Sequence, residues 1–328
     1  MLQLIFSLLF LINLSNAYDC HLTYTAVNIS QATYCMTQTS MWDCITCDTT
    51  NSYDNILIQN GEQVIFGFNE EYESIFISFR GSENVQNWIA NIKVSQITPY
   101  PETTIAVAKG FYNLFDSLQS NVYKVVDELV EKYNTNQLLL TGHSLGAALA
   151  TLTAFDILYY QKNYKIISLI TFGSPRVGNK DFSKMFETYN INSIRVTHYY
   201  DMVPHVPEEF LGYRHISKEV WYNEPNTEYT ICNDGNGTDD YGWLGLPGGF
   251  RYDYDGDFDD SGAWDEHGPY SYGPYGCPNE DDSSQACQTS ATGACTPGTD
   301  CTDCPWDPAC PETFEADYWN SANGNQVD

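Results

Sequence analysis

The sequence predicts an α/β fold, in which a mostly parallel central sheet is covered by helices on both faces. Between about residues 24 and 222, strand-like segments alternate with segments whose apolar residues recur at helical spacing. The apolar run Leu138–Leu140 leads into a glycine-rich turn and then a helical segment, as a buried strand does in such a sheet. The chain has 328 residues, enough for a domain of about 250 residues with a large core.

The first 17 residues are expected to be a secretory signal peptide. The run from Leu2 to Leu14 is almost continuously apolar, and Ser15-Asn16-Ala17 offers a small-x-small cleavage site. This segment has no Lys or Arg, so a retained membrane anchor is the alternative interpretation. The run is short for a membrane span, however, and no other segment approaches about 20 apolar residues.

Eleven cysteines and two glycosylation sequons, which begin at Asn28 and Asn236, agree with an oxidising, exported environment. We therefore expect a soluble, secreted protein with no transmembrane span.

The regular elements follow in chain order. Strands are expected at 63–68, 74–79, 137–141, 165–172 and 192–199, and helices at 111–133 and 145–160. The first of these helices has one apolar face, formed by Phe111, Leu114, Phe115, Leu118, Val122, Val125, Val126 and Leu129. We divide the chain into the signal peptide 1–17, an α/β domain 18–277 and an irregular, acidic, cysteine-bearing tail 278–328.

Charge is concentrated near the C-terminus. Residues 233–328 contain 20 Asp and Glu and one basic residue, Arg251, so this part carries −19 of the net charge of −29. Such a surface disfavours nucleic acids and anionic membranes as partners. The acidic stretch 253–260 fails as an EF-hand loop, because Arg251 and Gly262 occupy its first and last ligand positions. A solvated acidic loop is favoured over an irregular calcium site, and we expect no metal centre and no cofactor.

The residues that carry chemistry begin with Gly142-His143-Ser144-Leu145-Gly146, between an expected strand and an expected helix. In that context the pentapeptide forms a sharp turn that exposes the Ser144 hydroxyl, with a helix N-terminus beneath it. The alternative is a glycine-rich turn that contains a serine by chance.

Three further segments accompany Ser144. Residues 77–82 end a strand at Arg80-Gly81-Ser82, residues 171–179 form a turn-rich loop, and Asp201-Met202-Val203-Pro204 follows a strand. Together these ordered motifs resemble the class 3, fungal-type triacylglycerol lipases over about residues 24–277. The resemblance implies the α/β-hydrolase fold and a Ser-Asp-His triad, with Ser144 as the nucleophile and Asp201 as the acid. It also implies an oxyanion hole formed by Ser82 and the backbone N–H of Leu145.

The resemblance favours His267 as the catalytic base, because Asp265-Glu266-His267-Gly268-Pro269-Tyr270 is similar to the family's Asp-His-x-x-Tyr. The match is imperfect, since Glu266 replaces the usual aspartate. His215, which precedes a Glu-x-Trp segment, is the alternative.

The same resemblance implies two disulfides. One joins Cys35 to Cys277, about ten residues after the expected base, and the other is the local pair Cys44–Cys47. A redox-active Cys-x-x-Cys is the alternative for the second pair. The pairing of the remaining cysteines stays open, namely Cys20, Cys232, Cys287, Cys295, Cys301, Cys304 and Cys310.

Residues 82–92 have helical spacing with one apolar face, formed by Val85, Trp88, Ile89 and Ile92. The resemblance implies a lid that opens at a lipid–water interface, and an amphipathic surface helix is the alternative.

The leading hypothesis is therefore a serine carboxylester hydrolase that acts on triacylglycerols at such an interface. A phospholipase, a feruloyl-type esterase and a catalytically silent binding protein are the alternatives. The sequence does not fix the oligomeric state.

Overall fold

The computed structural model of the chain describes residues 18–36, 42, 44, 46–47, 50–82, 95–198, 201–216, 218–222 and 229–232. Its helices are α2 (Cys20–Cys35), α4 (Lys109–Tyr133), α5 (Leu145–Tyr159) and α6 (Lys180–Thr188), with 3₁₀ turns η1 (Val203–His205) and η2 (Glu209–Leu211). Two expected terminal regions, 1–17 and 278–328, lie outside the described residues, so the predicted domain boundaries stay predictions.

Within the described residues, eight strands form the main sheet in the order β1-β2-β3-β6-β7-β9-β11-β12. They are β1 (Asn51–Gln59), β2 (Glu62–Asn69), β3 (Ser74–Phe79), β6 (Gln137–His143), β7 (Lys165–Phe172), β9 (Ser193–His198), β11 (Glu219–Tyr222) and β12 (Tyr229–Cys232). The central neighbours from β3 to β11 are all parallel, whereas β1, β2 and β12 add antiparallel edges. The predicted mostly parallel sheet is confirmed.

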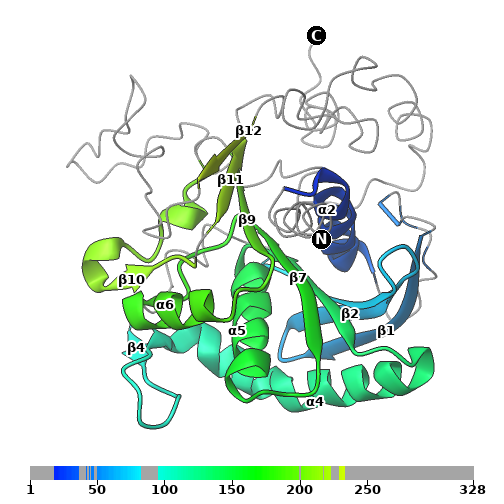
Figure 1. Cartoon of the computed structure of the whole chain (residues 1–328), viewed down its shortest axis with the longest axis horizontal. Helices are drawn as coiled ribbons and strands as arrows, with labels where there is room; N and C mark the ends of the chain where they lie inside the picture. Colours follow the sequence, from blue (N-terminus) through cyan, green and yellow to red (C-terminus); the bar gives the residue numbers. More distant parts are fainter. Residues whose placement is uncertain are drawn as a thin grey trace, which may run out of the picture.

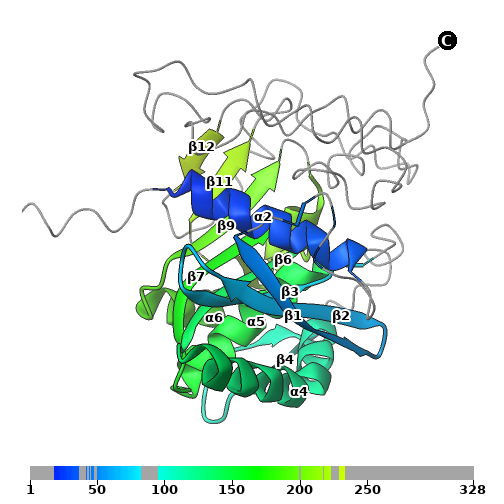
Figure 2. The same ribbon diagram turned by 90° about the vertical axis from the view of Figure 1, so that its right-hand side faces the viewer.

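Alternation along the strands divides the core between the two faces of the sheet. On β3, Ile75 and Ile77 pack with α4 and α5, whereas Phe76 packs on the opposite face with α2. Figures 1 and 2 show the resulting layers, with α2 on one side of the sheet and α4 and α5 on the other. The predicted coverage of both faces is therefore also confirmed.

A second, small antiparallel sheet has the order β10-β8-β5-β4. Its strands are β4 (Gln96–Ile97), β5 (Val107–Ala108), β8 (Gly178–Asn179) and β10 (Tyr213–Arg214). It ties the chain that follows β7 and β9 to the segment that enters α4, and so it anchors the loops at the carboxyl edge of the main sheet.

Capping explains where the helices begin and end. Asp19 starts α2 by accepting a 2.9 Å hydrogen bond from the Leu22 N–H through its Oδ1 atom. Asn134, with a φ of 50°, ends α4 in the left-handed conformation.

The sequence analysis missed α2, α6 and β1, together with the short strands β4, β5, β8, β10, β11 and β12. Most α2 residues are buried, including Thr23, Thr25 and Gln31, so this helix lacks the apolar stripe that reveals amphipathic helices. The hairpin between β1 and β2 turns at Asn60-Gly61, both at positive φ, which is a strong hairpin signal that could have revealed β1.

The burial of α2 bears on one expected modification. Asn28 lies within this helix and is only 5% exposed, so a glycan at Asn28 does not fit the packing. Glycosylation at this sequon therefore stays a prediction that the burial of Asn28 disfavours, whereas Asn236 lies outside the described residues. Among the described helices, none is long and apolar enough to cross a membrane.

Candidate active site

Ser144 occupies a sharp turn between β6 and α5. Its φ of 58° and ψ of −125° lie in a region that non-glycine residues rarely adopt, so the backbone is strained there. The flanking glycines explain why the turn can be so tight. A Cβ atom on Gly142 would lie 2.6 Å from the carbonyl of Gly146, and one on Gly146 would lie 2.0 Å from the carbonyl oxygen of Phe79. The predicted strand–turn–helix context is therefore present.

The structure shields Ser144 from solvent, whereas the sequence analysis expected an exposed hydroxyl. The residue is fully buried, and its backbone N–H donates to the Phe172 carbonyl at 2.9 Å. Its Oγ atom has no hydrogen-bond partner among the described residues. A buried hydroxyl without a partner costs about 1–3 kcal/mol, and such exceptions occur at catalytic positions.

The expected oxyanion donors lie on the β3 side of Ser144. A Cβ atom on Gly81 would lie 3.0 Å from the Ser144 Cβ, so the chain leading to Ser82 contacts the nucleophile turn. Leu145 is the first residue of α5, where backbone N–H groups have no intrahelical partner and favour negative charge. The structure thus places both expected donor segments beside Ser144.

Asp201 lies on the opposite side, three residues after β9. It is 2% exposed, and its Oδ1 atom accepts a 2.8 Å hydrogen bond from the Val203 N–H. Because β6, β7 and β9 are parallel neighbours, the chain ends that carry Ser144 and Asp201 are separated by two strand spacings, roughly 10 Å. That separation leaves room for one imidazole ring between hydroxyl and carboxylate.

Two basic side chains, His215 and Arg176, contact the backbone of the loop that follows Asp201. His215 is completely buried, and its Nε2 atom lies 2.7 Å from the Pro204 carbonyl oxygen. The Arg176 guanidinium donates to the carbonyls of His205 and Pro207. Burial, with further contributions from the Arg195 and Arg176 charges, lowers the pKa of His215 well below its usual value. His215 is therefore engaged in fixing the segment after Asp201. Sequence reasoning missed this use of Arg176, since no local pattern reports it.

Several expected site residues lie outside the described residues. They are the base His267, the lid residues Val85, Trp88, Ile89 and Ile92, the cysteine Cys277 and the sequon residue Asn236. The Cys44–Cys47 disulfide is present, and Cys35 is also disulfide-bonded. Within the described ranges, no group of three or more His, Cys, Asp or Glu side chains is arranged to hold a metal ion.

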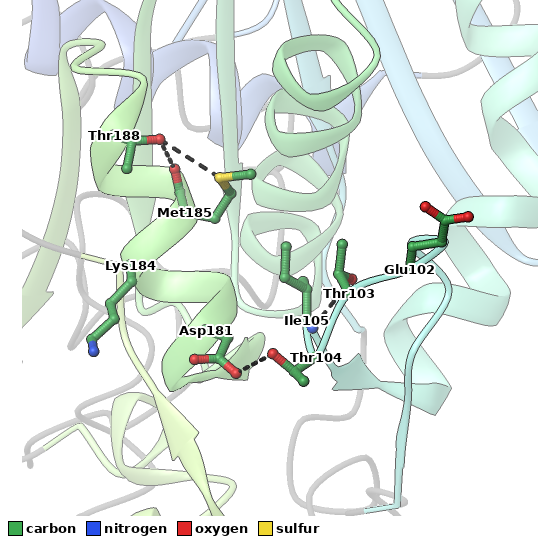
Figure 3. Close-up of a pocket in the computed structure, with 8 residues that line it drawn as sticks. All are labelled: Glu102, Thr103, Thr104, Ile105, Asp181, Lys184, Met185 and Thr188. Atoms are coloured by element: carbon green, nitrogen blue, oxygen red, sulfur yellow. Dashed lines mark hydrogen bonds between the residues drawn. The ribbon is translucent and has the colours of Figure 1, made fainter.

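An open hollow of about 600 Å³ lies elsewhere on the surface, between α6 and the segment that precedes β5. Figure 3 shows its lining, in which the Thr104 hydroxyl donates to Asp181 at 2.6 Å. None of the residues predicted to be catalytic lines this hollow, so we do not place the active site there.

Comparison with known proteins agrees with this geometry. Residues 76–211 match the family model described as lipase (class 3). A lipase from Rhizomucor miehei is 32% identical over 227 residues, which cover 65% of this chain and 61% of the relative. The chain thus spans about three fifths of that curated relative's length.

Solved structures agree as well. Lipase II from Rhizopus niveus has a TM-score of 0.61 at 26% identity, covering 65% of this chain and 84% of its own. A triacylglycerol lipase with a serine protease triad as its catalytic centre has a TM-score of 0.58 at 28% identity. The match covers 64% of this chain and 82% of the chain of that lipase. With its elbow serine, its sheet order and these matches, the chain has the α/β-hydrolase fold and is similar to the class 3 lipases over residues 76–211.

Proposed function

We propose that the chain is a secreted carboxylester hydrolase that cleaves acyl esters of lipids, with triacylglycerols as the first substrate class. The observation that carries this proposal is Ser144, a buried serine in a strained turn at the N-terminus of α5. Its hydroxyl has no partner among the described residues, so it is available to a base that lies outside them. The triacylglycerol lipase among its structural relatives supports the choice of substrate class.

The reaction would proceed by acyl transfer. The Ser144 Oγ atom attacks the ester carbonyl while His267 takes the hydroxyl proton. His267 then donates that proton to the departing alcohol oxygen as the C–O bond breaks. Water attacks the acyl-enzyme, His267 accepts a proton from it, and the fatty acid leaves as Ser144 regains its hydrogen. Asp201 orients the imidazole and stabilises its protonated form.

The negative charge that develops on the ester carbonyl oxygen would be bound by two expected hydrogen-bond donors. The N–H of Leu145 and the donor group of Ser82 would bind the oxyanion in the tetrahedral intermediate. Because Ser144 is buried in a water-poor turn, such hydrogen bonds act in a low dielectric and are stronger than in water. The oxyanion hole needs no rearrangement when both segments already contact the nucleophile turn.

The choice of His267 rests on the resemblance of its segment to the family's Asp-His-x-x-Tyr, and the Cys35 end of α2 adds a second argument. A bridge from Cys35 to Cys277 would tie the loop that carries His267 to the end of α2. Tyr34, the neighbour of Cys35, lies 2.8 Å from Nδ1 of His143, so this bridge would hold the loop beside the nucleophile turn. His215 is the weaker candidate, because it is buried against the Pro204 carbonyl.

The experiment that tests the proposal is active-site labelling. A fluorophosphonate probe should modify the purified protein at Ser144, as located by peptide mass spectrometry, and Ser144→Ala should not react. Ser144→Ala should also lose at least about 10⁴-fold in ester hydrolysis while keeping its fold, since the turn is formed by the backbone. Unlabelled wild-type protein, or a fully active Ser144→Ala variant, would overturn the assignment.

A second assay separates the substrate classes. Hydrolysis of emulsified long-chain triacylglycerol is compared with hydrolysis of a phospholipid, a feruloyl ester and a soluble short-chain ester. A lipase should prefer the emulsion, whereas exclusive turnover of one of the other esters would replace the proposed substrate.

A further inference from the structure

The last turn of α2 is clamped to the strands that carry the active site. The Thr33 hydroxyl lies 2.6 Å from the Ser78 hydroxyl on β3. The Gln63 side-chain amide on β2 donates to the carbonyls of Thr33 and Met36, at 2.6 and 2.9 Å. This end of the helix is therefore held in register with the carboxyl end of β3.

Tyr34 lies between these contacts and reaches two segments of the active site at once. Its hydroxyl oxygen accepts a 3.0 Å hydrogen bond from the Gly81 N–H and lies 2.8 Å from Nδ1 of His143. Gly81 directly precedes Ser82, and His143 directly precedes Ser144. One hydroxyl group thus connects the chain of the expected oxyanion hole to the chain of the nucleophile.

Hydrogen-bond chemistry allows both contacts together. A backbone N–H can only donate, so the Tyr34 oxygen accepts from Gly81, and its own proton is available for an unprotonated Nδ1 of His143. Space around Gly81 is as restricted as these bonds require. A Cβ atom there would lie 2.4 Å from the Tyr34 oxygen and 2.6 Å from the His143 carbonyl oxygen. The Gly81 peptide therefore has little freedom while Tyr34 is in place.

Regular strand pairing does not hold the Gly81 peptide in place. The Arg80 N–H still donates to the Gln63 carbonyl at 2.9 Å, but β3 has ended at Phe79 and Gly81 continues past the sheet. The bond from Gly81 to Tyr34 is the next point at which this backbone is held.

We propose that Tyr34 is a positioning residue of the oxyanion hole, which fixes the Gly81–Ser82 peptide against the nucleophile turn through its hydroxyl. This inference rests on the proposed hydrolase function. Tyr34 acts through Ser82 and does not contact substrate. It comes from α2, which precedes the residues 76–211 matched by the family model, so the N-terminal helix contributes to catalysis as well as to the core.

Tyr34→Phe is the direct test, assayed with a soluble short-chain ester so that interfacial effects do not enter. We expect kcat to fall roughly 10- to 100-fold with KM unchanged, somewhat less than the loss of a whole oxyanion donor. Affinity for a trifluoromethyl ketone, which forms a tetrahedral adduct with the nucleophile, should fall by a similar factor.

Two control variants separate positioning from stability. Tyr72→Phe removes a similar tyrosine–histidine contact to α2, since the Tyr72 hydroxyl lies 3.0 Å from Nδ1 of His21, which is on that helix. Thr33→Val removes the adjacent hydroxyl bond to Ser78. Both variants should keep wild-type kcat, although Thr33→Val should lower the Tm.

A double-mutant cycle tests whether Tyr34 acts through Ser82. Tyr34→Phe should have little further effect in a Ser82→Ala background, because both changes impair the same donor. Three results would each overturn the inference. Folded Tyr34→Phe could have the same kcat as Tyr72→Phe, or Thr33→Val could lose as much kcat as Tyr34→Phe. The third is full additivity between the effects of Tyr34→Phe and Ser82→Ala on kcat. Failure of the hydrolase proposal is distinguishable, because Ser144→Ala would then remain active.

Discussion

Ser144 combines full burial, a φ of 58° and a hydroxyl without a partner among the described residues. Each property costs folding free energy, because strained backbone and unsatisfied polar groups both destabilise the native state. Gly142 and Gly146 make the tight turn possible, because a Cβ atom at either position would collide with neighbouring backbone. At the scale of a single residue, the strained turn and the unpartnered hydroxyl therefore support the proposed role of Ser144 as a nucleophile.

The two candidate bases lead to different activity losses. His267→Ala should reduce ester hydrolysis about as much as Ser144→Ala, because triad members act as a unit. His215→Asn should lose far less activity, since His215 holds the Pro204 carbonyl and an amide can still donate there. Initial rates with a soluble ester, measured on folded variants, decide between them. The reverse order of losses would make His215 the base.

His215 also predicts a pH dependence of stability. Burial lowers its pKa in the folded state well below its usual value, so below about pH 6.5 the unfolded chain binds a proton that the folded chain does not. The free energy of unfolding should therefore decrease as the pH falls below 6.5, by at most about 1.4 kcal/mol per pH unit from this one group.

Urea unfolding of the wild type and His215→Asn between pH 7 and pH 5 measures this contribution. The wild type should lose more stability than the variant over that range, because only the wild type carries the histidine. Parallel stability curves for the two proteins would contradict the prediction.

At the scale of elements, three loops at one edge of the sheet carry the site. The loop after β3 leads to Ser82, the turn after β6 holds Ser144, and the loop after β9 holds Asp201. Because β3, β6 and β9 run parallel in one sheet, their carboxyl ends all lie at the same edge. The supports differ, since Tyr34 holds the first loop, whereas Arg176 and His215 hold the last.

The expected lid is a further element with a test of its own. Trp88→Ser should impair hydrolysis of emulsified long-chain triacylglycerol and spare soluble short-chain esters. An open lid would present Trp88 to lipid, where burial of a large apolar side chain contributes roughly 1.5–3 kcal/mol. Trp88→Phe, which keeps an aromatic ring, should retain most of the interfacial activity. Equal losses of Trp88→Ser on both substrates would assign Trp88 to ordinary packing.

At the scale of the whole molecule, the acidic C-terminal segment and the residues of the hydrophobic core occupy different parts of the sequence. The described core spans the sheet and its helices, whereas residues 278–328 contribute ten acidic and no basic residues. Truncation after Cys277 should therefore leave a folded protein with wild-type activity on soluble esters, because the removed segment lacks apolar periodicity. Gel filtration and the ester assay check this result. An insoluble, inactive product would mean that a cysteine of the domain, such as Cys232, is bridged to the tail.

Local patterns in the sequence were enough to predict the α/β class, the strands at 74–79 and 165–172, and the turn that carries Ser144. Each of these depends on neighbouring residues, since apolar runs and flanking glycines report burial and tight turns directly. The helix α2 escaped prediction because most of its residues are buried, polar ones included, which leaves no stripe to detect.

By itself, the sequence determined the α/β class, the central strands and the helices that follow two of them, the turn that carries Ser144, and the concentration of charge near the C-terminus. Only the tertiary structure decided which distant groups support them. Tyr34 reaches Gly81 across 47 residues, and Arg176 reaches Pro207 across 31. Such contacts depend on how α2 and the loops pack against the sheet, and no spacing along the chain encodes that packing.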